Sequence, residues 1–177
     1  MILDSKTLEM DCIMRTASRA CTAARTAPKT RGIDNIHTCV VNAEELNAIA
    51  DEMDRLNAVY GLASFKRDAQ NVRSSDAVVL IGTIESKRGL NAACGYCHHE
   101  NCAACEQANG TCVYDAMDLG IALGSAVSII SDDRVDNRIM FSIGKAALSL
   151  GMMPPEVKIA MGIPLSVKGK NPFFDRK

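Results

Sequence analysis

Five of the eight cysteines in this chain fall within 19 residues, from Cys94 to Cys112. The segment is CGYCHHENCAACEQANGTC, a C-x2-C-x4-C-x2-C-x6-C pattern. A C-x2-C pair turns the backbone so that both sulfurs face one centre, and thiolates this close together suit a metal ion or an iron–sulfur cluster. Gly95 and Gly110 supply the backbone freedom that tight ligand loops need. The segment therefore predicts a thiolate-bound metal centre.

Three ligand assignments fit this spacing. The two C-x2-C pairs would form a four-thiolate zinc site, although the gap between them is shorter than in zinc ribbons. The run Cys97-x4-Cys102-x2-Cys105 matches plant-type ferredoxins, which implies a two-iron cluster with a more distant fourth ligand. The third assignment is a four-iron cluster on Cys94, Cys97, Cys102 and Cys112. Spacing alone leaves all three open.

The two histidines inside the segment and the three cysteines outside it have simpler interpretations. His98 and His99 lie inside the loop, where we expect them to be solvated or to tune a cluster by hydrogen bonding rather than to ligate. Cys12, Cys21 and Cys39 lie on predicted core elements and are interpreted as small apolar fillers. No Ser-His-Asp arrangement, P-loop or H-E-x-x-H sequence offers a residue for acid–base or acyl-transfer chemistry.

Composition excludes several classes of partner. The 177 residues carry a net charge of −1, contain no Trp and are only 4% aromatic, so neither a basic footprint nor a base-stacking platform for nucleic acid is expected. The N-terminus lacks the basic and apolar regions of a secretory signal. The longest strongly apolar run, near Ala77–Ile81, is too short to cross a membrane. A reducing, cytoplasmic setting follows, in which clustered cysteines are ligands rather than disulfides.

Periodicity and turn residues predict three strands separated by helices. The expected elements are a helix over 5–27, a strand over Ile36–Val41, a helix carrying Leu46 to Leu56, a strand over Asp76–Gly82, a helix carrying Leu119 to Ile130, a helix carrying Ile139 to Leu150, and a strand over Val157–Ile163. The polar residues 136–138 are expected to cap and bridge the helices on either side. Three strands are few, so we expect packing against a second subunit.

Two local patterns refine these helices. Asn42 and Glu45 have the spacing of a capping box at the start of the second helix. Gly120, Gly124 and Ser128 repeat every four residues on a later helix. Each glycine costs a helix about 1 kcal/mol relative to alanine, so a stripe of small residues suggests a closely packed partner.

Several segments resemble known families. Cys94-Gly-Tyr-Cys97-x4-Cys102 resembles the CGxCGxxxC iron–sulfur domain of the carbonyl-processing corrinoid machinery, with His98 at the second Gly. Nearly the whole chain resembles DUF2148, a family of prokaryotic proteins with a ferredoxin domain. The segments that carry this resemblance are ARTAPKTRG (24–32), DLGIALGSAVS (118–128), VDNRIMFSIGKAALSLG (135–151) and, most specific, GIPLSVKGKNPFFDR (162–176). The resemblance implies that Cys94, Cys97, Cys102 and Cys112 are the ligands, with Cys105 an extra thiol or an alternative ligand.

A looser resemblance is to the FMN-dependent nitroreductase fold. It rests on Arg15 and Arg19 in the first helix, Ala27-Pro28, Asp118-x-Gly120-x-Ala122 and Gly162-Ile-Pro164, in that order. It implies an α+β fold with a mixed sheet flanked by helices. The Cys-rich segment 90–113 would be an insertion in a single domain of residues 1–177. It also implies a homodimer that holds FMN. The residues proposed to bind the FMN phosphate are Arg15, Arg19, Lys168, Lys170 and Arg176.

These observations predict a cytoplasmic iron–sulfur redox protein. The cluster, with a four-iron form favoured, would pass single electrons, and FMN would collect two for a small substrate or a redox partner protein. The alternative is a non-catalytic binding or structural protein, whose loop is locked by zinc or by an iron–sulfur cluster.

Overall fold

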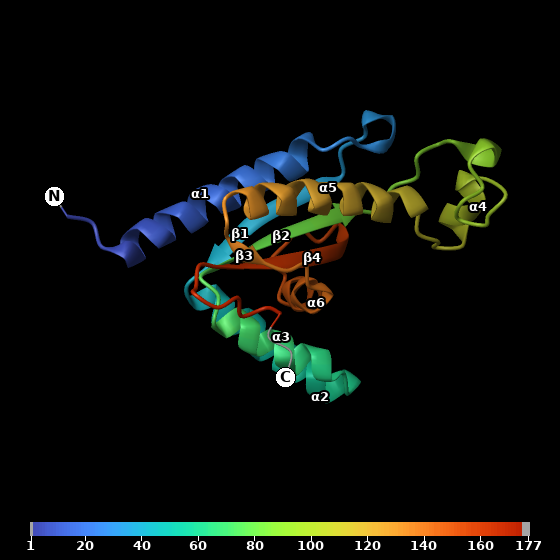
Figure 1. Ribbon diagram of the computed structural model, residues 1–177. Helices are drawn as coiled ribbons and strands as arrows, with labels where there is room; N and C mark the ends of the chain where they lie inside the picture. The colour runs from blue at the N-terminus through green and yellow to red at the C-terminus, as the bar shows by residue number, and fades with distance from the viewer. Residues whose placement is uncertain (1, 175–177) are drawn as a thin grey trace.

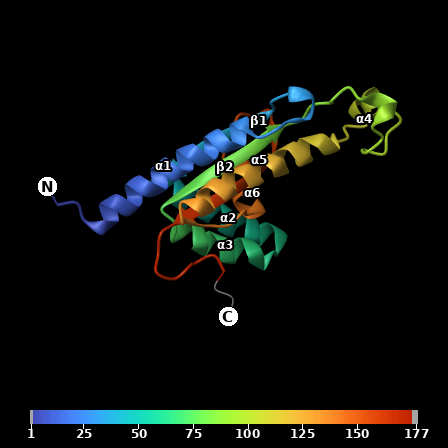
Figure 2. The same cartoon turned by 45° about the horizontal axis from the view of Figure 1, so that its top comes forward.

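The computed structural model describes residues 2–174. The elements are, in chain order, α1 (Ser5–Thr26), η1 (Thr30–Gly32), β1 (Ile36–Asn42), α2 (Glu44–Tyr60), α3 (Ala63–Arg73), β2 (Ala77–Ile84), η2 (Asn91–Ala93), α4 (Cys102–Gln107), α5 (Val113–Asp132), β3 (Asp136–Asn137), α6 (Phe141–Ser149) and β4 (Val157–Ser166). The strands pair antiparallel in the order β1-β2-β4-β3. Helices α1 and α5 cover one face of this sheet, and α2, α3 and α6 cover the other (Figures 1 and 2). The α+β class predicted from the sequence is confirmed.

The central strand β2 explains why two cores form. Every residue from Ala77 to Thr83 is buried. Because side chains alternate along a strand, Val79 and Ile81 join the core under α1 and α5, whereas Val78 and Leu80 join the core under α2, α3 and α6. A continuous apolar run is typical of a strand covered on both faces.

Helix α6 packs unusually closely on β4. A Cβ atom on Gly144 would lie 1.9 Å from the carbonyl oxygen of Ala160, and one on Gly162 would lie 2.1 Å from Cγ2 of Ile143. Only glycine at these two positions permits this approach of helix backbone to strand backbone.

Two local predictions are wrong, and one helix was not foreseen. The residue before α2 is Ala43, at φ 52°, and no side chain caps the helix, so Asn42 and Glu45 do not form a capping box. Residues 136–138 do not cap the flanking helices. Asp136 and Asn137 form β3 against β4, and Arg138 donates to the carbonyl oxygen of Phe173. Helix α3 had no counterpart among the predicted elements.

Helix α5 shows a glycine-bearing face to open space. A Cβ atom on Gly120 or Gly124 would meet no atom within 4 Å, and Met117 and Ile121 are 45% and 43% exposed nearby. The opposite face buries seven residues, five of which pack in the core between α1, α5 and the sheet. The helix is long and apolar enough by length and composition to cross a membrane, a test that a core helix of a soluble protein also passes.

Candidate metal centre

The Cys-rich segment connects β2 to α5 and lies beyond the end of the sheet (Figures 1 and 2). It contains η2 and the short helix α4, whose first turn is capped by Asn101, with Oδ1 accepting from the amide of Ala104 at 2.9 Å. Cys112 is the residue that precedes α5. The last of the five cysteines is therefore fixed by a long, packed helix.

Four of the five cysteines line one pocket. They are Cys94, Cys97, Cys102 and Cys112. This is the set that the DUF2148 resemblance selected, and Cys105 is not among the lining residues. Segments up to 18 residues apart in the chain thus bring four thiol donors to a common space.

The fifth cysteine is buried behind this pocket. Cys105 is only 1% exposed, and its thiol donates to the carbonyl oxygen of Gly110 at 3.3 Å. Burial raises the pKa of Cys105, and a hydrogen bond with Cys97 raises it further. A protonated, buried thiol is a poor competitor for metal, because the thiolate is the ligand.

The backbone of the segment takes turns that ordinary residues rarely adopt. Positive φ angles occur at Asn91 (52°), Gly95 (65°), His98 (60°) and Asn109 (50°). His98 thus makes the turn for which the CGxCGxxxC pattern has glycine. The turn at Asn91 aims its amide at Cys102 Sγ, with N···S 3.4 Å. Peptide N–H groups directed at sulfur are the interactions that tune iron–sulfur clusters.

The two histidines of the loop lie in different surroundings. His98 is exposed, whereas His99 lines the pocket and would lie 2.9 Å from a Cβ atom on Gly110. Gly110 is needed here for close packing rather than for a positive φ. Tyr96 and Tyr114 also line the pocket, with ring centroids 5.9 Å apart.

The thiols do not converge on one point. Within residues 2–174, no group of three or more His, Cys, Asp or Glu side chains is close enough to hold a single metal ion. The donor set, four thiols around one pocket with an amide directed at one sulfur, has the chemistry that an iron–sulfur cluster requires.

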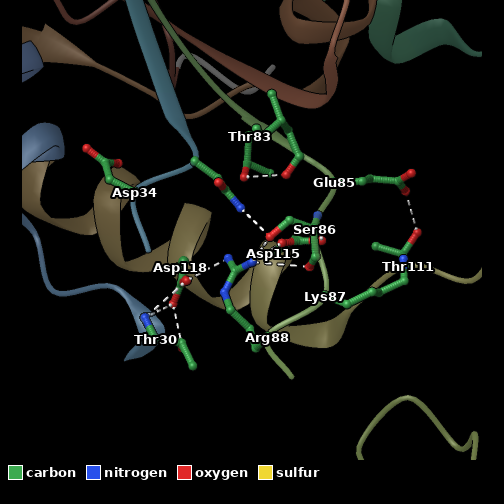
Figure 3. A network of polar contacts seen from close by, with 12 residues as sticks. Thr30, Asp34, Thr83, Glu85, Ser86, Lys87, Arg88, Thr111, Asp115 and Asp118 are labelled. Atoms are coloured by element: carbon green, nitrogen blue, oxygen red, sulfur yellow. Dashed lines mark hydrogen bonds and ion pairs between the residues drawn. The ribbon is translucent and has the colours of Figure 1, made fainter. Parts of the chain in front are cut away.

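A buried ionic network lies where the segment joins the body of the protein (Figure 3). Arg88 is 1% exposed and contacts two carboxylates of α5, Asp115 and Asp118, each at 2.9 Å. Asp118 also accepts from the amide and the hydroxyl of Thr30, and Asp115 accepts from the amide of Ser86 at 3.1 Å. Burial raises the pKa of Asp115.

Further contacts fix both ends of the segment. Lys87 donates to the carbonyl oxygen of Gly110 at 2.6 Å, and Arg31 donates to the carbonyl oxygen of Arg88, also at 2.6 Å. Thr111 donates to Glu85 at 2.9 Å, as Figure 3 also shows. The segment is thereby tied to β2, to α5 and to the turn after α1.

The basic residues predicted to hold FMN are engaged elsewhere. Arg15 pairs with Asp11 at 2.8 Å, and Arg19 pairs with Asp133 at 2.5 Å. All four side chains line the same hollow, where the two carboxylates would repel a phosphate.

At the C-terminal end, Lys168 donates to the carbonyl oxygen of Ser74, next to the start of β2. Lys170 lies beyond β4, and Arg176 lies outside the described residues. Within residues 2–174, the charged groups of Arg15, Arg19 and Lys168 thus contact protein oxygen atoms, and the phosphate site stays a prediction.

The three cysteines outside the segment only partly match their predicted role. Cys21 and Cys39 are half-buried against the two cores, and burial raises the pKa of each thiol. Cys12 is exposed on α1, so its prediction as a core filler is wrong.

The fold is nitroreductase-like, carrying a thiol-lined pocket at its edge. Similar structures include a putative nitroreductase in complex with FMN from Desulfovibrio desulfuricans, with a TM-score of 0.59 at 14% identity over 100% of this chain and 81% of that one. The nitroreductase CinD from Lactococcus lactis in complex with nicotinic acid has a TM-score of 0.59 at 11% identity over 98% and 86%. The FMN-dependent nitroreductase NfnB from Mycobacterium smegmatis in complex with NADPH has a TM-score of 0.58 at 12% identity over 88% and 78%.

Sequence similarity defines the family. An uncharacterized protein from Archaeoglobus fulgidus is 39% identical to this chain over 184 residues, covering 99% of this chain and 98% of its own. The model of DUF2148, described as uncharacterized proteins containing a ferredoxin domain, matches residues 108–176. The chain belongs to the DUF2148 family. Family and fold together indicate a redox protein.

Proposed function

We propose that this protein is a cytoplasmic electron carrier whose iron–sulfur cluster is bound by Cys94, Cys97, Cys102 and Cys112. The observation that carries the proposal is that these four thiols line one pocket and Cys105 does not. When bound, a four-iron cluster supplies one-electron oxidation and reduction. The chain's own residues hold the sulfurs in place and limit access of water.

The surroundings of the pocket support this role. The amide of Asn91 donates to Cys102, and such hydrogen bonds stabilise the extra negative charge of a reduced cluster. Tyr96 and Tyr114 form a pair of rings at the pocket, and Tyr96 is 57% exposed. An aromatic side chain that reaches solvent from the cluster pocket offers a contact surface to a redox partner protein.

A matched pair of cysteine variants tests the ligand set. Cys112→Ser removes a pocket thiol, and Cys105→Ser removes a thiol from the same segment that does not line the pocket. After anaerobic reconstitution with iron and sulfide, we expect Cys112→Ser to lose most of its visible absorption and bound iron, and Cys105→Ser to retain most of both.

The opposite outcomes have definite meanings. Loading that depends on Cys105 and not on Cys112 would contradict the proposed ligands and favour the plant-type or paired spacing. A colourless protein with one zinc per chain would favour the structural-metal alternative. All eight cysteines are free thiols in the structure, in keeping with a reducing compartment.

A homodimer is the second part of the proposal. The exposed face of α5 combines the space left by Gly120 and Gly124 with the apolar side chains of Met117 and Ile121. Sedimentation analysis is expected to show a dimer that Gly124→Leu weakens. FMN binding by that dimer stays a prediction. Acid treatment should release a yellow compound from the protein, and a colourless dimer would contradict FMN binding.

A further inference from the structure

The buried arginine beside the cysteine pocket has an unused hydrogen-bond donor. Arg88 lines the pocket together with the four cysteines, and its side chain is only 1% exposed. Within the described part of the chain, its Nε atom is buried without a hydrogen-bond partner. Leaving a charged group's donor unsatisfied costs free energy, so such an atom calls for an acceptor.

The other two nitrogen atoms of this guanidinium both have partners. Nη1 donates to the carbonyl oxygen of Ser86 at 3.1 Å and to its hydroxyl at 2.6 Å, and it contacts Asp115 at 2.9 Å. Nη2 donates to Asp118 at 2.9 Å. These contacts hold the plane of the guanidinium, as Figure 3 shows, so the direction of the Nε–H bond is fixed before any ligand arrives.

We propose that Arg88 is a positioning residue for the cluster, with its Nε–H donating to a sulfur in the pocket and its positive charge favouring the reduced state. This inference rests on the proposed iron–sulfur function. A cluster with four thiolate ligands is negatively charged and becomes more so on reduction. A fixed cation and an N–H donor both stabilise that added charge, and both therefore raise the reduction potential.

Lysine cannot replace this arrangement. It keeps one positive charge but offers a compact ammonium instead of a planar fork, so it cannot satisfy Asp115 and Asp118 and still present a separate donor to the pocket. Arg88→Lys is therefore the sharpest variant. Lys145→Gln is its control, because it removes one positive charge from an exposed position of α6 that does not line the pocket.

The experiment compares wild type, Arg88→Lys and Lys145→Gln after anaerobic reconstitution. Three quantities are measured: the midpoint potential by spectroscopic titration, the bound iron and sulfide, and the melting temperature of the metal-free protein. We expect Arg88→Lys to take up the cluster. Its one-electron reduction equilibrium constant should fall at least tenfold, which corresponds to a midpoint potential lower by about 59 mV. Lys145→Gln should change that equilibrium by less than threefold.

The outcomes separate this inference from the proposed function. Wild type that takes up no iron or sulfide refutes the proposed function itself. Arg88→Lys that loads normally with a reduction equilibrium within twofold of wild type overturns the role of Arg88 and leaves the cluster standing. If Arg88→Lys does not fold, the double variant Arg88→Gln/Asp118→Asn removes the cation together with one carboxylate. Its reduction equilibrium should fall at least threefold, and an unchanged value overturns the inference.

Discussion

Asp118→Ala should be among the most destabilising substitutions on α5, even without any cofactor. Asp118 is 2% exposed and accepts from the amide of Thr30 at 3.1 Å, from its hydroxyl at 2.9 Å and from Arg88 Nη2 at 2.9 Å. Alanine leaves both donors of Thr30 without this acceptor and leaves Arg88 with Asp115 as its one remaining carboxylate in the network. Removing one partner of a buried ion pair costs about 3–5 kcal/mol.

Thermal and urea unfolding of the metal-free protein, followed by far-UV circular dichroism, measures this loss. For a chain of this length a loss of 3–5 kcal/mol lowers the melting temperature by roughly 6–20 °C. The matched control is Asp132→Ala, an exposed aspartate at the end of the same helix, where we expect a change within about 0.5 kcal/mol. If Asp118→Ala loses less than about 1 kcal/mol relative to this control, the network does not stabilise the fold as argued.

Three further substitutions test packing and pH dependence. Gly144→Ala should destabilise by about 1–3 kcal/mol or more, because its Cβ atom would lie 1.9 Å from the carbonyl oxygen of Ala160. Gly120→Ala, in open space on α5, should stabilise the monomer by up to about 1 kcal/mol. If the two glycine variants change the free energy of urea unfolding equally, the close packing of α6 on β4 is contradicted. Two hydrogen bonds from Arg55, at 2.7 Å each, lower the pKa of Glu52 from 4.5 to about 2. The stability from this lowered pKa is therefore present above pH 4.5 and is lost as the pH falls toward 2. Glu52→Gln should cost about 1 kcal/mol at neutral pH and almost nothing near pH 2, and a deficit that does not change with pH would contradict the assignment.

Local patterns in the sequence predicted much of the sheet and its helices. The apolar run at Asp76–Gly82 became β2, and the predicted first helix ends at Thr26, before Pro28. The short strand β3 escaped prediction because two residues carry no periodicity, and they pair with β4 almost thirty residues later in the chain. Helix α3 escaped because its residues are mostly polar, with only four buried.

The sequence predicted the cysteines of the candidate site but not the residues that hold the segment in place. Spacing left three ligand sets open, and only the folded segment shows that Cys105 does not line the pocket. The network around Arg88 joins residues up to 88 positions apart, which no local pattern encodes. A signal was nevertheless present, because Asp115 and Asp118 are one helical turn apart in a helix whose only other charged residue is Asp132 at its end. A carboxylate pair on a buried helix face needs a buried cation.

The most direct test of the central claim is the iron and acid-labile sulfide content of the wild-type protein after anaerobic reconstitution, with its visible spectrum. The account predicts about four irons and four sulfides per chain and a broad visible band that bleaches on reduction. Protein that stays colourless and binds neither element would contradict an iron–sulfur centre at Cys94, Cys97, Cys102 and Cys112.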